Sequence, residues 1–288
     1  MRAREPSLAL VLLLLGAGSA LAHPGWGIVV DSKGNVFYTD LKQVWRISAD
    51  GRQTIAVPNV HTHELYLDSN GTLHGEHLWY DGAKAKWGHY LWELTDEKVV
   101  RHPPREGFRA SESFVRDPSG AMYWLEGNRI LKRAPGGPTV EVAKVARRSD
   151  APGQAPGGIL AAGHDGTLYL VSAGDLLHVT AAGQTVSLAT GLDEHVWTAF
   201  MTQPWHYIMG LAVDPQSNVY IANSGARKVK KVTRDGKVSV IATAHFPWSP
   251  TGIAIHNGEV YVLEYTVTGG SARVRKLSAG GRLTRIAH

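Results

Sequence analysis

The sequence contains no cysteine in 288 residues. This absence excludes disulfide bonds, thiolate nucleophiles, cysteine-ligated metal sites and the modified cysteine that anchors a bacterial lipoprotein. Helical periodicity is also absent beyond the first 22 residues. The chain must therefore fold around an apolar β-sheet core that is stable without covalent cross-links.

Long apolar runs are missing everywhere except at the N-terminus. Arg2 and Arg4 precede the run Leu8–Leu15, and Ala20-Leu21-Ala22 has the small-x-small pattern of a cleavage site. The run is too short to span a bilayer. We therefore expect residues 1–22 to be a signal peptide, and residues 23–288 to be secreted or periplasmic without membrane insertion after cleavage.

Strong charge of one sign is missing as well. The formal net charge is +5 at pH 7, and the densest basic run is Lys228, Lys230 and Lys231. No stacking aromatics alternate with these lysines, so nucleic acid is not an expected partner. The sequence also lacks a Ser-His-Asp motif, a phosphate-binding glycine loop and a dinucleotide fingerprint. We expect a monomer that binds a small molecule.

One sequence pattern, which we call the repeated phrase, occurs six times. Gly27–Tyr38 and Gly210–Ile221 align without a gap, each reading as a short apolar strand, an Asp turn and a second apolar strand. Weaker copies start at residues 64, 113, 159 and 252. Spacings of roughly 40 to 50 residues suit one four-stranded propeller blade per repeat. The sequence predicts an all-β fold, a six-bladed β-propeller of four-stranded antiparallel blades over residues 23–288.

The repeated phrase resembles the NHL repeat and, more broadly, the gluconolactonase-like, strictosidine-synthase-like and peptidyl-hydroxyglycine-lyase propellers. This resemblance implies the same fold for residues 23–288. In the lyase family, a histidine directly before the repeat phrase binds zinc, and His63 occupies that position here. In the gluconolactonase-like family a glutamate on the first strand of blade one takes part in the site, and Trp26 replaces it. Asn223 and Glu264 are the residues that echo the later part of that arrangement.

The repeat also predicts which side chains surround the channel mouth. The first strand of each blade starts, and the second ends, on the same face of a propeller. The residues just before the first strands are Trp26, His63, Glu112, Gly158, Met209 and Thr251, and those ending the second strands are Asp40, His77, Glu126, Ser172, Asn223 and Glu264. Imidazoles and carboxylates together are the ligands of Zn or Ca sites.

We assign roles to these residues as hypotheses. His61, His63 and Glu112 are candidate metal ligands, and His77, Glu126 and Glu264 are candidate proton-transfer groups. Trp26, Asp40 and Asn223 are candidate ligand-binding residues. The alternative for Asp40, Glu126, Asn223 and Glu264 is a structural role, in which they hydrogen-bond neighbouring blades.

Two further segments carry chemistry-bearing side chains. Trp205 and His206, in the ring-rich segment 191–209, could form the wall of an apolar or sugar-binding pocket, or equally cap the core between two blades. Signal cleavage would leave His23 at the N-terminus, where its amine and imidazole could chelate copper. Chance placement by signal processing explains this histidine better, so copper is not the expected cofactor.

Two functions follow from these observations. The preferred hypothesis is an exported, divalent-metal-dependent hydrolase or lyase that acts on a small molecule at the channel mouth. The competing hypothesis is a non-catalytic propeller that binds a protein, peptide or glycan.

Overall fold

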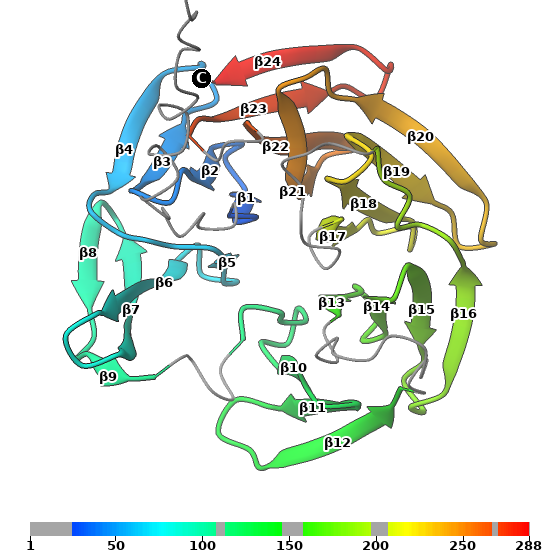
Figure 1. Ribbon diagram of the computed structural model, residues 1–288, viewed down its shortest axis with the longest axis horizontal. Coiled ribbons are helices and arrows are strands. Elements are labelled where there is room, and N and C mark those ends of the chain that lie inside the picture. The colour runs from blue at the N-terminus through cyan, green and yellow to red at the C-terminus, as the bar shows by residue number, and fades with distance from the viewer. Residues whose placement is uncertain (1–24, 108–112, 146–157, 197–206, 267–269, 288) are drawn as a thin grey trace, which may run out of the picture.

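The computed structural model describes residues 25–107, 113–145, 158–196, 207–266 and 270–287. These residues form six antiparallel sheets arranged as a ring around a central channel (Figure 1). The predicted all-β, six-bladed propeller is confirmed. The predicted signal peptide, His23, Glu112, Trp205 and His206 all lie outside the described residues. Within the described ranges, no helix is long and apolar enough to cross a membrane.

Each blade is formed by one consecutive stretch of chain. Its strands lie side by side in sequence order, with the first at the channel and the last at the rim. The strands of blades one to three are β1 (Ile28–Val30), β2 (Val36–Thr39), β3 (Val44–Ile47), β4 (Gln53–Val57); β5 (Leu65–Leu67), β6 (Leu73–Asp81), β7 (Lys86–Thr95), β8 (Lys98–Arg101), β9 (Arg105–Glu106); β10 (Met122–Glu126), β11 (Arg129–Arg133), β12 (Thr139–Lys144). Those of blades four to six are β13 (Ile159–Ala162), β14 (Leu168–Ser172), β15 (Asp175–Val179), β16 (Thr185–Ala189); β17 (Ile208–Val213), β18 (Val219–Asn223), β19 (Lys228–Val232), β20 (Val238–Thr243); β21 (Trp248–His256), β22 (Glu259–Thr266), β23 (Ala272–Leu277), β24 (Leu283–Ala287).

Blades two and three depart from four strands. In blade two, the short β9 also pairs with β7. In blade three, the innermost strand is reduced to a bridge between Arg116 and Met122, supported by the hydrogen bond from Tyr123 N to Val115 O at 2.9 Å. The position of the first strand is thus kept in blade three, although its ladder is short.

The aspartate of the repeated phrase shapes the turn between the first two strands. Oδ1 of Asp31 accepts hydrogen bonds from the backbone N–H groups of Lys33 at 2.9 Å and Asn35 at 2.8 Å. Oδ2 of Asp31 accepts another from Nδ2 of Asn35 at 2.7 Å. Gly34, between them, has φ = 81°, which glycine adopts without strain. The phrase is therefore a turn signature, and its side chains stabilise the hairpin instead of forming a site.

Apolar side chains fill the spaces between blades. Among the described residues, five clusters of buried apolar side chains join blades six and one, one and two, three and four, four and five, and five and six. Representative pairs across these interfaces, in the same order, are Tyr38 with Leu263, Val44 with Leu73, Tyr123 with Leu168, Tyr169 with Ile221, and Ala222 with Val262. No such cluster joins blades two and three within the described ranges.

Among the described residues, the first and last blades exchange no strand where the ring closes. β1 to β4 form one sheet, and β21 to β24 form another. The hydroxyl of Tyr265 donates to the carbonyl oxygen of Thr39 at 2.7 Å, and Oγ1 of Thr39 donates to Thr62 O at 2.7 Å. Both side chains are essentially buried. Packing and these hydrogen bonds join blades six, one and two.

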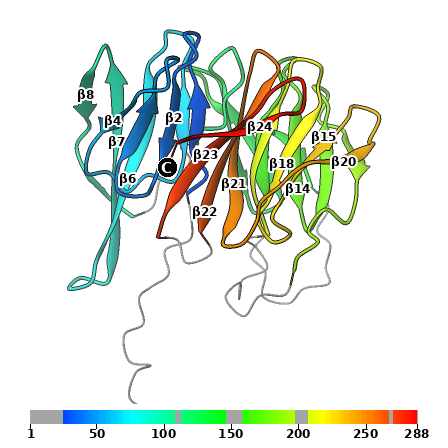
Figure 2. The ribbon, with the colours of Figure 1, turned by 90° about the horizontal axis from the view of Figure 1, so that it is seen from above.

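The β6–β7 hairpin is longer than its counterparts. β6 has 9 residues and β7 has 10, whereas β2 and β3 of blade one have 4 each. Figure 2 shows this hairpin extending beyond the ring, toward the face that is seen in Figure 1. The extra residues form a wall beside the channel mouth.

Candidate functional site

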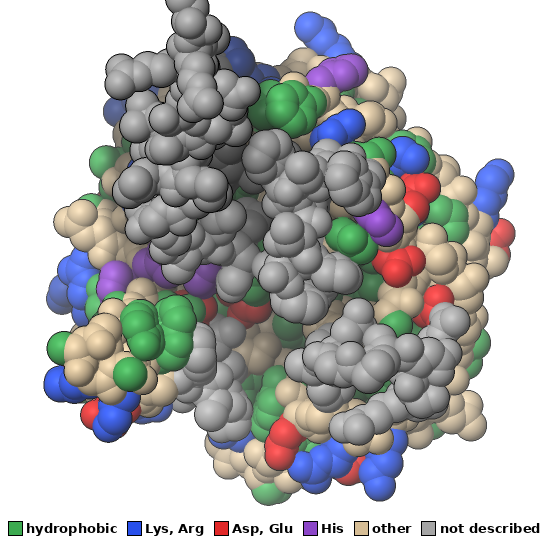
Figure 3. Space-filling view, in the orientation of Figure 1, with side chains coloured by type: hydrophobic (Ala, Val, Ile, Leu, Met, Phe, Trp, Pro, Cys, Tyr) green, Lys and Arg blue, Asp and Glu red, His purple; other side chains and the backbone are tan. Residues whose placement is uncertain are grey.

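Three histidines of blade two lie close together on the face seen in Figure 1. His61 and His63 belong to the segment between β4 and β5, and their ring centroids are 4.7 Å apart. His63 also lies 5.8 Å from Trp26, measured between ring centroids. His77 belongs to β6, and its Nδ1 accepts a hydrogen bond from the backbone N–H of His61 at 2.9 Å. Figure 3 shows histidine side chains gathered on this face of the molecule.

The hydrogen bonds of His61 and His77 give the two imidazoles opposite tautomers. Nδ1 of His77 accepts from an N–H group, so the proton of the neutral ring is on Nε2. Nδ1 of His61 lies 2.9 Å from the carbonyl oxygen of Leu41, which can only accept, so this nitrogen carries the proton. Nε2 of His61 is therefore a basic nitrogen, and Nε2 of His77 is a hydrogen-bond donor.

The environment of His77 favours its neutral form. Burial lowers the pKa of His77 below its usual value of 6.5, and the positive charges of His61 and Arg101 lower this pKa further. The ring stacks against Tyr90 at 4.8 Å and against Trp79 at 5.7 Å between centroids. A neutral His77 near pH 7 keeps the donor at Nε2 and supplies no proton for transfer.

The aromatic residues beside His77 come from the extended hairpin. His77 pairs directly with Tyr90 across the ladder, and Trp79 pairs with Gly88. A Cβ on Gly88 would lie 2.3 Å from the Trp79 indole, so only glycine allows the indole to lie flat over the neighbouring strand. Trp79 and Tyr90 were not among the residues selected from the sequence. The alternation of His77 and Trp79 along β6 was the signal that could have identified both.

A cavity of about 550 Å³ occupies the channel beside this histidine group. Its wall comes from the innermost strands and includes the apolar residues Leu65, Met209, Leu211 and Ile253. Trp26 belongs both to this wall and to the ring contacts with His63. Ring contacts lead from Trp26 in the channel wall through His63 to His61, and the backbone hydrogen bond of His61 continues the series to His77 on the hairpin; we call these four residues the ring row.

The polar residues at other strand ends have structural partners. Oδ2 of Asp40 accepts from Nε1 of Trp45 at 2.8 Å. Asn223 is fully buried and donates to the carbonyl oxygens of Leu192 and Glu194 at 2.7 and 3.0 Å. These contacts support the structural alternative, and the proposed ligand-binding roles of Asp40 and Asn223 stay predictions.

The two candidate catalytic glutamates are ion-paired. Glu264 has no exposed side-chain surface and pairs with Arg273 at 2.7 Å and with Arg275. Glu126 is 59% exposed and pairs with Arg129 at 2.9 Å. The two guanidinium groups contact both carboxylate oxygens of Glu264, which supports the structural alternative for this residue. Their catalytic roles likewise stay predictions, and the ring row does not include them.

The residues present fit a metal ion only in part. His61 offers Nε2 with its Nδ1 held by a carbonyl oxygen, which is the usual orientation of a ligating imidazole. His63 stands next to it. In the described part of the chain, no group of three or more His, Asp or Glu could hold a metal ion. A complete site would need Glu112, which lies outside the described residues.

The chain is similar in fold to several solved propellers. Its sequence matches no protein-family model and no curated protein. Virginiamycin B lyase from Staphylococcus aureus superposes with a TM-score of 0.51 and 16% identity over 91% of this chain and 83% of the lyase. A catalytically inactive histidine-to-alanine variant of that lyase, solved with quinupristin, matches similarly, at a TM-score of 0.51 and 15% identity over 91% of this chain and 83% of the variant.

Two other matches have different functions. A gluconolactonase from Xanthomonas campestris gives a TM-score of 0.54 and 11% identity over 84% of each chain. A chain of a nidogen/laminin complex gives 0.58 and 10% identity over 87% of this chain and 91% of that chain. These likenesses place the fold among propellers that include lyases, lactonases and binding proteins. At these identities they bear on fold alone.

Proposed function

We propose that this chain is a hydrolase or lyase that acts on a small ester or lactone at the ring row. The observation that carries the proposal is the pair of opposite tautomers in His61 and His77. Nε2 of His61 would take a proton from a water whose oxygen attacks the carbonyl carbon, or from a carbon next to the carbonyl group in an elimination. The C–O bond of the ester then breaks, and the protonated His61 returns the proton to the leaving oxygen. Nε2–H of His77 would donate a hydrogen bond to the carbonyl oxygen as negative charge develops there.

This division of roles differs from the proton-transfer role expected of His77. A neutral imidazole whose Nδ1 already accepts a backbone hydrogen bond would have to become an imidazolate to give up its Nε2 proton. A fixed donor costs no such ionisation and still stabilises the oxyanion. Trp26, Trp79 and Tyr90 would flank the substrate, because aromatic faces give large contact areas at low entropic cost.

Similarity to a lyase and to a gluconolactonase supports this reaction class at the level of fold. The divalent-metal-dependent form, with Zn or Ca held by His61, His63 and Glu112, rests on a ligand set that the described residues do not complete. When bound, such an ion would polarise the carbonyl group. No step above depends on it.

The test is a hydrolysis and elimination screen on a panel of lactones and aryl esters. His61→Gln is expected to lower kcat by about 100-fold or more, because a general base contributes roughly 10²–10⁴-fold. His102→Gln, which changes a histidine outside the ring row, is the matched control. An active wild type whose rate survives His61→Gln contradicts the proposal. Elemental analysis and dialysis against EDTA decide the metal-dependent form.

A second candidate is a non-catalytic propeller that binds a protein, peptide or glycan. The extended hairpin favours it, because Tyr80 and Trp87 pack together at 5.1 Å between centroids while staying 53% and 40% exposed. Binding that is lost in Tyr80→Ala but unchanged in His61→Gln would support this candidate over the enzyme.

Export is part of the same proposal. Residues 1–22 carry the three parts of a secretory signal, and a small molecule outside the cytoplasm would be the ligand. N-terminal sequencing of the product from expressing cells is expected to start at His23. A product that keeps Met1 and stays in the cytoplasm would contradict export.

A further inference from the structure

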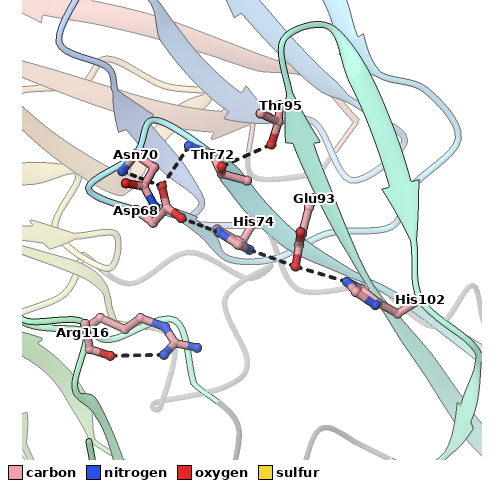
Figure 4. Close-up of polar contacts among 9 residues, drawn as sticks. Asp68, Asn70, Thr72, His74, Glu93, Thr95, His102 and Arg116 are labelled. Atoms are coloured by element: carbon pink, nitrogen blue, oxygen red, sulfur yellow. Dashed lines mark hydrogen bonds and ion pairs between the residues drawn. The ribbon is translucent and has the colours of Figure 1, made fainter. Parts of the chain in front are cut away.

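The interface between blades two and three contains a polar groove where the other blade interfaces contain apolar clusters. A cavity of about 420 Å³ lies in it. The blade-two side contributes Tyr66, Asp68, His74 and Glu93, and the blade-three side contributes Phe114, Arg116, Ser119 and Pro135. Figure 4 shows Asp68, His74, Glu93 and His102 following one another along blade two, with Arg116 across the groove. We call this groove the blade 2–3 seam.

Arg116 breaks the pattern of the repeat at this point. It directly precedes the turn between the first two strands, a place that is aliphatic in the other five blades. The equivalent residues are Val30, Leu67, Ala162, Val213 and Ile255. Val30 and Leu67 pack against the apolar clusters on either side of blade one. An arginine here replaces packing with charge at one interface only.

The guanidinium group of Arg116 has few hydrogen-bond acceptors for its N–H groups. Nη1 donates to the carbonyl oxygen of Gly120 across 3.4 Å, which is long for a hydrogen bond. Nε is buried and has no hydrogen-bond partner. The guanidinium carbon lies 5.2 Å from the centre of the Tyr66 ring, which attracts the cation but accepts no ordinary hydrogen bond from Nε. No carboxylate of the described residues lies within 4 Å of it.

The nearby carboxylates are already engaged elsewhere. Asp68 accepts from the backbone N–H groups of Asn70 and Thr72, both at 2.9 Å, and faces His74 at 3.3 Å. Asp117 accepts from the hydroxyl of Tyr123 at 2.8 Å and from turn N–H groups. These bonds hold the pKa of both carboxyls below the usual value. Their turn contacts keep them from turning toward Arg116.

We propose that the blade 2–3 seam is a second binding site, which takes a small monoanionic carboxylate on Arg116. Arg116 lines both the seam and the channel cavity, so a ligand can reach it from either side. A carboxylate matches the planar guanidinium fork, and it would accept from the Nη groups, whose one protein acceptor among the described residues is the distant carbonyl oxygen of Gly120. Phe114, which also lines both cavities, offers an apolar surface for the rest of the ligand.

The surrounding charges select a monoanion over a phosphate. Burial raises the pKa of the Tyr66 hydroxyl, the charge of Arg116 over the ring lowers it, and the carboxylates of Asp68 and Asp117 each raise it by a smaller effect, so both aspartates act on this site. A dianion would meet this same negative field with only one arginine to balance it. The seam shares no residue with the ring row, so this site does not depend on the proposed enzymatic function.

Isothermal titration of the full mature chain with benzoate tests the site, with benzamide as the neutral isostere and inorganic phosphate as the dianion. We expect saturable binding of benzoate and binding of benzamide and phosphate that is weaker by roughly tenfold or more. Arg116→Leu, which restores the aliphatic residue of the other blades, is expected to weaken benzoate binding by a similar factor. Arg282→Leu removes an exposed arginine from blade six and should leave binding unchanged.

Thermal melting shows whether each variant folds, and Arg116→Gln replaces the leucine variant if that one does not. Equal binding of benzoate and benzamide overturns the proposal, and so does equal benzoate binding by the wild type and the folded Arg116 variant. Tighter binding of phosphate than of benzoate overturns the assigned ligand class. Absence of saturable benzoate binding overturns the site itself.

Discussion

The backbone N–H of His61 donates to Nδ1 of His77, across 2.9 Å, and thereby leaves Nε2 of His77 as the nitrogen available to a ligand. This contact joins the segment before blade two to the second strand of that blade. Because the donor is a main-chain group, side-chain substitutions nearby leave the contact in place. The orientation of His77 is therefore a property of the fold.

The tautomers can be observed directly. We expect neutral His77 to carry its proton on Nε2 and neutral His61 to carry its proton on Nδ1, because of their bonds to an N–H group and to a carbonyl oxygen. Two-dimensional ¹⁵N NMR of the imidazole rings above pH 7 distinguishes the two forms. A His77 ring protonated at Nδ1 would refute the assignment of donor and base.

Stability is expected to fall in mild acid through His77. Its pKa in the folded chain is lowered, chiefly by burial, so below about pH 6.5 the unfolded chain binds a proton that the folded chain does not. The free energy of unfolding contributed by this group is complete above that pH and is lost as pH falls through the folded pKa. Urea denaturation at pH 7.5 and 5.5 should show a smaller decrease for His77→Gln than for the wild type. An equal or larger decrease in the variant contradicts the lowered pKa.

Glu264 is expected to be important for stability. Replacing it by glutamine leaves Arg273 and Arg275, 15% and 11% exposed in their side chains, without their shared carboxylate. Breaking a buried ion pair on one side costs about 3–5 kcal/mol. Glu126→Gln breaks an exposed pair with Arg129 and should cost about 1 kcal/mol or less. Similar urea midpoints for the two variants would show that the buried pair has no special importance.

Ring closure is expected to depend on the Tyr265 hydroxyl. Tyr265→Phe removes the donor to Thr39 O and leaves a buried carbonyl oxygen with one partner fewer, at a cost of about 1–3 kcal/mol. Tyr80→Phe, on a ring that is 53% exposed, is the control and should change little. Chemical denaturation of both variants measures the difference. A Tyr265→Phe variant with an unchanged free energy of unfolding would mean that packing alone closes the ring.

The repeat made the fold predictable because each of its signals is local. Asp31 and its equivalents accept hydrogen bonds from backbone N–H groups two and four residues later in the sequence. The turn can therefore be predicted from the sequence. The proximity of His61 and His63 could be read in the same way. The contact of His77 with His61 could not, because it depends on how the segment after blade one lies against β6.

The sequence did not reveal the partners with which the candidate site residues interact in the folded chain. Glu264 stands at a strand end as expected, but its two arginines come from the neighbouring strand β23, and sequence alone did not show that they would neutralise it. Arg116 was not selected, although its place in the repeat is aliphatic in every other blade. A position-by-position comparison of the six repeats would have identified Arg116 as the exception.

Because each blade comes from one consecutive stretch of chain, the propeller can be divided between blades. Where first and last blades share no strand, a cut between two repeats leaves every sheet whole, so any inter-blade junction can serve as a new pair of ends. Whole repeats are thus units that duplication, loss or transplantation can move without breaking a hydrogen-bonded ladder.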